Sequence, residues 1–301
     1  MTVDTEPPAA RPRGRRSAVL VAVVVVVALL VGGLGAAWWK GRSSSPVDDG
    51  PPPRLVWSDD FTSGSLSSAA WDPLHLSTFG DGNQELACLT DRAQNLSVSD
   101  GSLVLTALRE QPPLPCGTTD DRFPGGRDYS SAFISTEGLL TWRHPRVEVR
   151  AALPLAPGVS AGLWPAFWMR PEDKSPGELD ILEGLGSGDS SPATLHQTIH
   201  FPQDGRTQQE THEVDLPDGF DPTQFHTYAM DVRTDRVDWS IDGVVTFSVD
   251  ADQVPGLVAT LDKPWFLRLN LAVGGTWPGS PTSATVLPAS MRVDWVKVYQ
   301  R

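Results

Sequence analysis

The sequence predicts an all-β domain over residues 54–301, built as a jelly-roll sandwich of two antiparallel sheets. Short runs of alternating or β-branched residues recur along it, at 102–107, 146–151, 237–241, 244–249 and 291–299. Helical periodicity is nearly absent, and turn dipeptides separate the runs. Asp242-Gly243 and Asp100-Gly101 are typical of two-residue hairpin turns. No internal repeat and no second change of composition interrupts this part, so we expect one domain.

One apolar segment precedes the predicted domain. Residues 18–39 are an uninterrupted apolar run, long enough for the ~20 residues of a transmembrane helix. Arginines gather in the basic tail at 1–17, so the tail is expected in the cytoplasm and the domain outside, as in a single-pass protein of the cell membrane. A cleaved signal peptide ending near Gly35 and Ala37 is the alternative and would give a secreted protein. Residues 40–53, rich in Pro, Ser and Gly, indicate a linker.

The charge of the chain narrows the choice of partner. The net charge is −13, and residues 1–53 hold six basic and four acidic side chains, which leaves −15 on the remainder. Such an acidic domain repels phosphate and sulfate polymers, so nucleic acid and heavily sulfated polysaccharides are poor partners. A neutral polymer is compatible with this charge.

Tryptophan and cysteine are the informative residue types. The chain has 11 Trp against 3 Tyr, which fits either a carbohydrate-binding cleft or a Trp-rich core. Cys88 and Cys116 are the two cysteines, too few to build a zinc site alone. An extracytoplasmic domain would allow a disulfide between them, but the sequence does not show whether they approach each other.

Three acidic residues, Glu178, Asp180 and Glu183, lie in an otherwise apolar strand. Side chains two residues apart share a face of a strand, so Glu178 and Asp180 point the same way. Glu183 is at an odd spacing from Glu178 and would face the core, where a charge is costly. A β-bulge at Ile181-Leu182 would return Glu183 to the acidic face.

Three carboxylates on one face repel one another unless they share protons, and this arrangement suits glycoside hydrolysis. One carboxylate attacks the anomeric carbon and a second protonates the leaving oxygen. Glutamate reaches further than aspartate, so Glu178 and Glu183 are expected to flank the bond, with Asp180 holding the nucleophile. Calcium binding and a solvated acidic run are the alternatives, and the alternation with apolar residues argues against the second.

The stretch GELDILEG at 177–184 resembles the bulged Glu-x-Asp-x-x-Glu signature of glycoside hydrolase family 16, in its laminarinase-like (endo-β-1,3-glucanase) branch. Further blocks resemble the same family in order along the chain, at 57–61, 83–107, 129–136, 162–169, 196–200, 225–231, 270–279 and 293–300. So many blocks in one order argue against a chance match.

The resemblance implies a β-jelly roll with a cleft across its concave face, and a retaining endo-glycosidase that hydrolyses laminarin-like β-1,3-glucan. It implies Glu178 as nucleophile, Glu183 as acid/base and Asp180 as the assisting acid. No cofactor is expected for catalysis. The expected partner is a neutral β-glucan polysaccharide, nucleic acid is not expected, and the protein is expected to be a monomer.

The resemblance also implies substrate-binding roles for Asn83, Trp164, Trp168, His196, His200 and Trp277. Trp164 and Trp168 share a face of one strand, and core packing is the alternative for each. His196 and His200 share a face as well. As a metal pair they would need a third ligand, which the resemblance does not supply.

A structural calcium ion is implied on the convex face. Asp294 matches an acid that holds this ion, and Gly101 would supply a backbone carbonyl, both being oxygen ligands of the kind calcium prefers. A solvated Asp on an edge strand is the alternative. Two residues depart from the family pattern: Phe133 stands where Arg is common, which alters the glycone side of the cleft, and Cys88 stands where an aromatic residue is common, which favours a local disulfide.

Other activities on the same fold remain alternatives at this point. Mixed-linkage β-1,3/1,4-glucanase and transglycosylase would keep all three acids. A non-catalytic glucan-binding protein would have lost a catalytic Glu, and here Glu178 and Glu183 are both present. Agarase and carrageenase are disfavoured by the acidic charge and by the blocks at 162–169 and 270–279.

Overall fold

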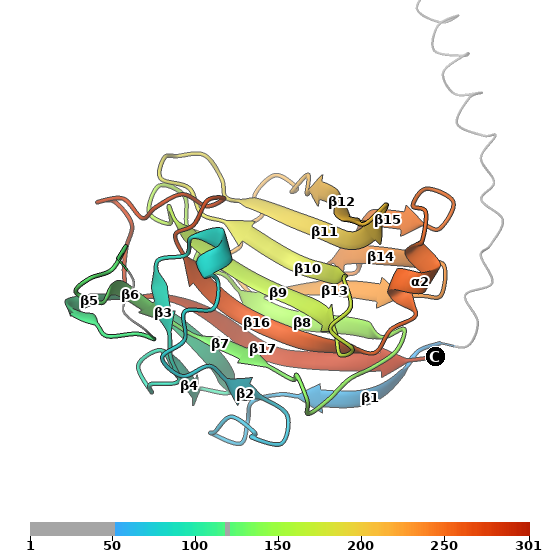
Figure 1. The fold of residues 1–301 in the computed structure, drawn as a ribbon, viewed down its shortest axis with the longest axis horizontal. Coiled ribbons are helices and arrows are strands. Elements are labelled where there is room, and N and C mark those ends of the chain that lie inside the picture. The colour runs from blue at the N-terminus through green and yellow to red at the C-terminus, as the bar shows by residue number, and fades with distance from the viewer. Residues whose placement is uncertain (1–51, 118–120) are drawn as a thin grey trace, which may run out of the picture. The chain divides into compact units, whose positions relative to one another are not determined.

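Two β-sheets packed face to face make up the fold in a computed structural model, which describes residues 52–117 and 121–301 (Figure 1). The basic tail at 1–17, the apolar segment at 18–39 and nearly all of the linker at 40–53 lie outside the described residues. Within the described ranges no helix is both long and apolar enough to cross a membrane. The all-β prediction is confirmed, since the helices described are the 3-10 turn η2 (Asp81–Asn83) and α2 (Leu257–Leu261).

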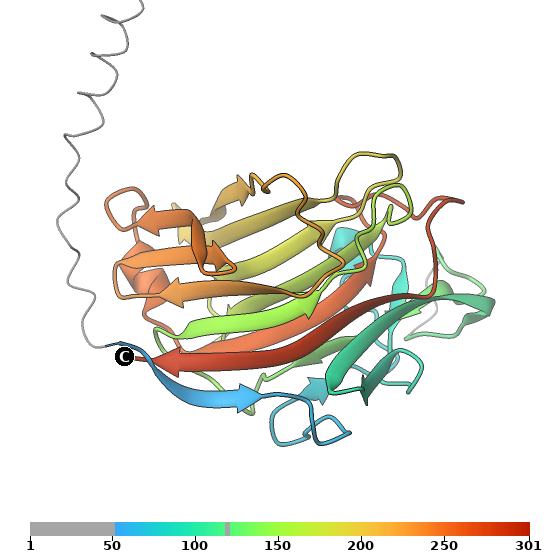
Figure 2. The ribbon, with the colours of Figure 1, turned by 180° about the vertical axis from the view of Figure 1, so that it is seen from behind.

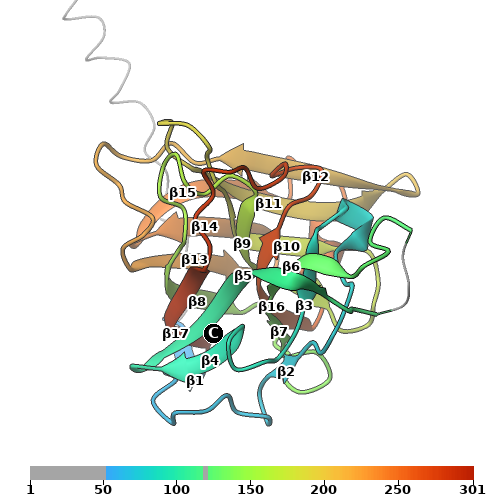
Figure 3. The same cartoon turned by 90° about the vertical axis from the view of Figure 1, so that its left-hand side faces the viewer.

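The larger sheet has ten strands and faces the viewer in Figure 2. Its main path runs β15 (Val244–Asp250), β14 (Arg236–Ile241), β13 (His226–Val232), β8 (Arg146–Ala152), β17 (Ala289–Gln300), β5 (Ser102–Leu114), β6 (Arg127–Ser131) and β3 (Ala87–Leu89). β1 (Arg54–Asp59) pairs with β17, and β4 (Leu96–Ser99) pairs with β5. Among the described strands only β3 and β6 pair in parallel; Figure 3 looks onto the end of the sandwich where they lie.

The smaller sheet has seven strands and faces the viewer in Figure 1. Its order is β12 (Arg206–Glu213), β11 (Thr194–Gln203), β10 (Glu178–Leu185), β9 (Leu163–Pro171), β16 (Trp265–Val273), β7 (Phe133–Ser135) and β2 (Asp72–Pro73). All neighbours in this sheet are antiparallel. Strands far apart in sequence, such as β9 and β16, are therefore direct neighbours.

The core lies between the two sheets and follows the predicted alternation. Phe167 and Met169 of β9 are fully buried, as are Val147 and Val149 of β8 on the opposite sheet. Burying one such side chain contributes roughly 1.5–3 kcal/mol. Since the core uses one face of the smaller sheet, the side chains between these positions point to the other face, where a site can form.

The predicted hairpin turns are confirmed by their backbone angles. Asp242 and Gly243 have φ values of 49° and 80°, and Asp100 and Gly101 have 50° and 68°. Positive φ at both central residues is the requirement of a type I′ turn, whose twist matches that of the flanking strands. These turns join β14 to β15 and β4 to β5.

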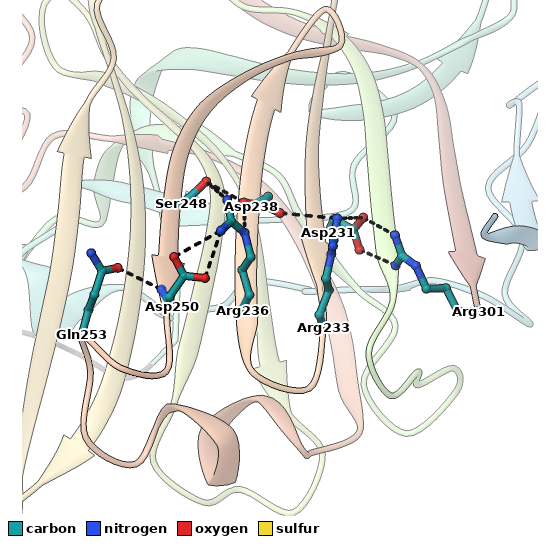
Figure 4. A network of polar contacts seen from close by, with 8 residues as sticks. All are labelled: Asp231, Arg233, Arg236, Asp238, Ser248, Asp250, Gln253 and Arg301. Atoms are coloured by element: carbon teal, nitrogen blue, oxygen red, sulfur yellow. Dashed lines mark hydrogen bonds and ion pairs between the residues drawn. The ribbon is translucent and has the colours of Figure 1, made fainter. Parts of the chain in front are cut away.

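The outer surface of the larger sheet carries a polar network across β13, β14 and β15 (Figure 4). Arg236 donates to Asp238 at 2.7 Å and to Asp250 at 3.0 Å, which links β14 to β15. Arg301 forms two 2.7 Å hydrogen bonds to Asp231 on β13, a paired geometry that is stronger than a single contact. The network holds the strands at this end of the sheet and brings the chain beyond β17 against β13.

Candidate active site

A cleft of about 990 Å³ lies on the face of the smaller sheet that points away from the core. Side chains of β7, β9, β10, β11 and β16 form its floor, and the segments around 79–85 and 276–277 add to its walls. Antiparallel pairing places the acidic residues of β10 at its centre, between β9 and β11.

The acidic residues reach the cleft because β10 bulges. Asp180 pairs with Thr198 and Glu183 with His196, so three steps along β10 match two steps along β11. Ile181 and Leu182, the two residues inside this irregularity, are both buried in the core. The predicted bulge at Ile181-Leu182 is therefore confirmed, and Glu183 joins Glu178 and Asp180 in lining the cleft.

A tryptophan of the opposite sheet supports the bulge. The indole N–H of Trp239 on β14 donates a 2.8 Å hydrogen bond to the backbone carbonyl of Asp180. Trp239 is fully buried, so this bond runs through the core from one sheet to the other. A bulge disturbs the ladder of the bulged strand, and a buried carbonyl that loses its ladder partner needs another donor.

Glu178 lies in the cleft beside two positively chargeable groups. Arg170 on β9 donates a 2.9 Å hydrogen bond to Glu178 Oε2. His200 Nε2 lies 3.5 Å from Glu178 Oε1. The arginine holds one carboxylate oxygen in place and leaves the other directed towards His200.

Asp180 is the most buried of the three acids, with 2% of its surface exposed. Burial first, and then the charge of Glu178, raise the pKa of Asp180 well above its usual value, while Arg170 opposes the rise. A raised pKa favours the protonated acid, which can donate a hydrogen bond to a neighbouring carboxylate. Asp180 is thus suited to share a proton with Glu178.

Glu183 lies in a different environment from Glu178. Burial raises the pKa of Glu183 well above its usual value, and the charges of Asp180 and Glu178 add to the rise. The indole N–H of Trp164 donates to Glu183 at 3.2 Å and acts in the opposite direction on the pKa. The cleft therefore presents one carboxylate bonded to arginine and one whose raised pKa favours the protonated form, an arrangement that can combine nucleophilic attack with general acid catalysis.

Comparison with known proteins agrees with this geometry. The model of the family "Glycosyl hydrolases family 16" matches residues 83–297, which is more than half of the chain. The chain belongs to glycosyl hydrolase family 16. The laminarinase-like resemblance noted from the sequence blocks is confirmed by the following relatives.

The β-glucanase of Rhodothermus marinus is 31% identical over 264 residues, covering 82% of this chain and 85% of that protein. Glucan endo-1,3-β-glucosidase A1 of Niallia circulans is 32% identical over 271 residues, but this chain spans only 38% of its length. The solved endo-β-1,3-glucanase of Pyrococcus furiosus has a TM-score of 0.69 and 33% identity, covering 84% of this chain and 96% of that one. This family 16 member thus shares both sequence and fold with β-glucanases.

The residues expected to bind substrate all line the cleft of this family 16 fold, namely Asn83, Trp164, Trp168, His196, His200 and Trp277. Trp277 is 42% exposed, packs edge-on against Trp164 at 5.3 Å and contacts His196 at 4.8 Å. Trp168 donates a 2.7 Å hydrogen bond to Asn270. Trp164 and Trp168 both lie on the cleft face of β9 and are not part of the core cluster between the sheets, although Trp164 is only 9% exposed.

Asn83 connects two segments that form walls of the cleft. Its backbone carbonyl accepts a 2.8 Å hydrogen bond from the N–H of Thr276. This bond joins the segment carrying Asn83 to the segment carrying Trp277, so both walls at this end of the cleft support each other. The side-chain amide of Asn83 also donates to Glu85 at 3.4 Å.

Glu85 is a cleft residue that the sequence did not indicate. Burial raises its pKa to about 7, the nearby Asp81 adds to the rise, and Asn83 and Arg127 oppose it. Its backbone carbonyl accepts a 2.9 Å hydrogen bond from Arg127, which fixes this wall of the cleft. Glu85 lies two residues after Asn83 in the sequence block 83–107, but no local signal marks it as buried.

Phe133, the departure from the family pattern, lies in a cluster of aromatic rings. Its ring centre is 5.0 Å from that of Phe79 and 6.2 Å from that of Trp168. The guanidinium of Arg268 on β16 lies 5.6 Å from the Phe133 ring and 4.8 Å from the Trp168 ring, within cation–π range. An arginine therefore does reach this side of the cleft, from a neighbouring strand.

Arg268, Asn270 and Arg170 were not predicted as site residues. Arg268 and Asn270 alternate with the buried Leu267 and Leu269, which is the period-two pattern of a strand with one face on a cleft. The alternation can be seen in the sequence. It places Arg268 and Asn270 in the cleft only once β16 is known to lie beside β9.

The predicted calcium ligands receive no support from their surroundings. The carboxylate of Asp294 lies 3.4 Å from the guanidinium of Arg150, so it already pairs with a cation. Gly101 lies in the turn between β4 and β5. Calcium takes about 6–8 oxygen ligands, and Asp294 and Gly101 would supply only two of them. The calcium site stays a prediction, and no step below depends on it.

The question that the sequence left open about the two cysteines is resolved. Cys88 and Cys116 form a disulfide, with their Cα atoms 5.8 Å apart. The bond ties β3 to the segment that follows β5. Both strands lie at the end of the sandwich seen in Figure 3.

Proposed function

We propose that this chain is a retaining endo-glycosidase that hydrolyses β-1,3-glucan by double displacement. The observation that carries the proposal is the bulge in β10, which puts Glu178 and Glu183 on one face while giving them different partners. Retaining glycosidases need two carboxyl groups about 5–5.5 Å apart, one on each side of the anomeric carbon. The relatives described above, named as β-glucanases, support the substrate class.

In the first step, the carboxylate of Glu178 attacks the anomeric carbon and forms a covalent glycosyl-enzyme. The carboxyl proton of Glu183 moves to the glycosidic oxygen, and the aglycone part of the glucan leaves as an alcohol. The raised pKa of Glu183 supports this role, since the acid must carry its proton before attack.

In the second step, the ionised Glu183 removes a proton from water, and the water oxygen attacks the anomeric carbon. The bond to Glu178 breaks, Glu183 regains its proton, and the sugar keeps its original configuration after two inversions. Asp180 acts through Glu178, because its protonated carboxyl can donate to the nucleophile and hold its orientation.

We also propose that the domain works outside the cell, held by residues 18–39 in the membrane. The charge asymmetry around that segment supports the orientation. The disulfide between Cys88 and Cys116 supports an oxidising compartment. Cell fractionation with sequencing of the mature N-terminus tests this, and a soluble form beginning near Trp38 would favour the cleaved signal peptide instead.

The decisive test of the reaction is product analysis. The protein is incubated with laminarin, lichenan, agarose and carrageenan, and NMR follows the anomer formed first. We expect laminarin to be cut and the β-anomer to appear first. An α-anomer would contradict the nucleophile role of Glu178, and cleavage of lichenan at a similar rate would identify a mixed-linkage enzyme.

Variants assign the two glutamates separately. Glu178→Ala should lose nearly all hydrolysis, and added azide should restore part of it by attacking from the vacated side. Glu183→Ala should spare the first step for substrates with good leaving groups, which need little protonation. Glu210→Gln serves as the matched control, because Glu210 is exposed on β12 of the same sheet and does not line the cleft.

A further inference from the structure

We propose that Zn²⁺ binds between Glu178, Asp180 and His200 and reversibly blocks the cleft. These residues come from the adjacent strands β10 and β11, with Glu178 and His200 directly paired. One ligand atom from each lies within 4.8 Å of the other two. The metal site does not depend on the proposed function, whereas the loss of activity that it causes rests on the nucleophile role of Glu178.

The distances between the ligand atoms match tetrahedral zinc. His200 Nε2 lies 3.2 Å from Asp180 Oδ2 and 3.5 Å from Glu178 Oε1. Zinc binds nitrogen and oxygen at about 2.0–2.2 Å, so ligands at tetrahedral angles are about 3.3–3.6 Å apart. Both distances to His200 are thus close to those of a zinc site, and the two carboxylate oxygens lie within 4.8 Å of each other, so a small movement of the Glu178 side chain would complete the site.

A buried oxygen without a partner points to a missing ligand. Asp180 Oδ2 is buried and has no hydrogen-bond partner among the described residues, although His200 is close to it. Buried polar atoms of this kind are rare and call for an explanation such as a proton or an ion. Glu178 can supply Oε1 as a ligand atom, because Arg170 bonds to Oε2 and Oε1 is directed towards His200.

The donor set selects the kind of metal. One imidazole nitrogen with two carboxylates suits zinc and similar transition metals, whereas calcium and magnesium prefer all-oxygen sites. All three residues line the cleft, so the fourth position of the metal opens to water. Zinc with three protein ligands and one water is a stable arrangement.

Occupation by zinc would stop the reaction. A carboxylate bound to the metal cannot attack the anomeric carbon, and the ion occupies space next to the bond to be cut. Glu183 is not a ligand in this arrangement, because its own neighbour is the indole of Trp164. We therefore expect zinc to compete with the glucan, and a chelator to restore full activity.

Binding is tested by calorimetric titration of zinc chloride into the full-length protein, after treatment with EDTA and desalting. We expect one site. His200→Gln should weaken binding at least tenfold, while Glu183→Gln should leave it within about threefold. His212→Gln is the matched control, since His212 lies on β12 against Phe247 and is not part of the site. Calcium and magnesium chloride should give no heat of binding at this site.

Two results would overturn the proposal: no zinc binding by the folded wild type, or equal binding by His200→Gln. Thermal melting of each variant shows that it is folded. Inhibition is measured separately on laminarin, and zinc binding without competition would refute the blocking role. If laminarin is not hydrolysed at all, the proposed function fails while the calorimetric result still decides the metal site.

Discussion

Glu183 and Trp164 form one of the contacts that set the protonation of the cleft, where burial and the charges of Asp180 and Glu178 have the larger effects. The indole N–H lowers the pKa of Glu183, against a larger rise caused by burial. Because Glu183 must be protonated before attack, kcat/KM should fall as pH rises through its pKa. The pH at which kcat/KM falls, the basic limb of the profile, therefore reports the pKa of Glu183, which burial raises and the indole N–H of Trp164 lowers.

Trp164→Phe should move the basic limb of the kcat/KM profile to higher pH. Phenylalanine keeps an aromatic ring but lacks the N–H, so the ionised form of Glu183 loses a donor and its pKa rises further. The pH profile on a soluble β-1,3-glucan measures the shift independently of any loss in overall rate. A limb that stays in place or moves down would contradict this account of Glu183.

Glu85 should make the fold less stable as pH rises from about 4.5 to about 7. Its pKa is raised on folding from 4.5 to about 7, so the folded state holds the proton more tightly than the unfolded chain. The stabilisation is complete below the unfolded value and is lost as pH rises through the folded one. At about 1.4 kcal/mol per pH unit it amounts to roughly 3 kcal/mol.

Melting of the Glu85→Gln variant and of the wild type across this range tests the effect. The glutamine cannot ionise, so the melting temperature of the variant should increase relative to that of the wild type as pH rises. Glu210→Gln should follow the wild type throughout, because Glu210 is exposed. Parallel curves for Glu85→Gln and wild type would show that Glu85 is already ionised in the folded protein.

At the scale of a structural element, the bulge in β10 depends on a donor in the other sheet. Trp239→Phe should lower kcat by about 10- to 100-fold, because small displacements of reacting groups of about 1 Å can cost ~100-fold. It should also cost roughly 1–3 kcal/mol, since the Asp180 carbonyl loses its buried donor. Enzyme kinetics and denaturant unfolding measure the two effects.

Trp71→Phe separates positioning from general destabilisation. Trp71 is also buried, at 1% exposed, and its indole N–H donates to a carboxylate oxygen of Asp59 at 3.0 Å, outside the cleft. We expect this variant to lose a similar amount of stability and to keep its kcat. If both variants lose activity equally, Trp239 has no special link to the site.

The same elements show what the sequence could and could not predict. The bulge at Ile181-Leu182 was predictable, because it follows from local spacing and the cost of burying Glu183. The donor from Trp239 was not, because it depends on which strand of the second sheet packs over β10. Arg268 was missed for the same reason, since its place in the cleft is set by the pairing of β16 with β9.

The fold class itself was predictable from alternation and turn residues, which act over a few positions. The order of the strands was not, because each neighbour is chosen by contacts between distant parts of the chain. β3 and β6, the one parallel pair among the described strands, illustrate this. Their pairing brings Cys88 and the segment near Cys116 to one end of the sandwich, a closeness that the sequence left open.

For the molecule as a whole, the disulfide should add about 3–4 kcal/mol by limiting the unfolded chain. This follows from the sequence separation of 28 residues between Cys88 and Cys116. Reduction should lower the melting temperature by roughly 10 °C for a domain of this size. The double variant Cys88→Ala, Cys116→Ala should melt at one temperature with and without reductant; a wild type insensitive to reductant, with its thiols shown to be free, would contradict the estimate.

β17 is the last strand of the domain in sequence, yet it pairs with β1, β5 and β8 near the middle of the larger sheet. During synthesis the ribosome therefore releases all the other strands before the one that joins them. Until β17 is available the larger sheet consists of separate parts. The contacts between β1 and β17, at opposite ends of the domain in sequence, can form only after that point. The larger sheet can therefore close only after nearly all of the domain has been synthesised, so a nascent chain without β17 should not hold this sheet together.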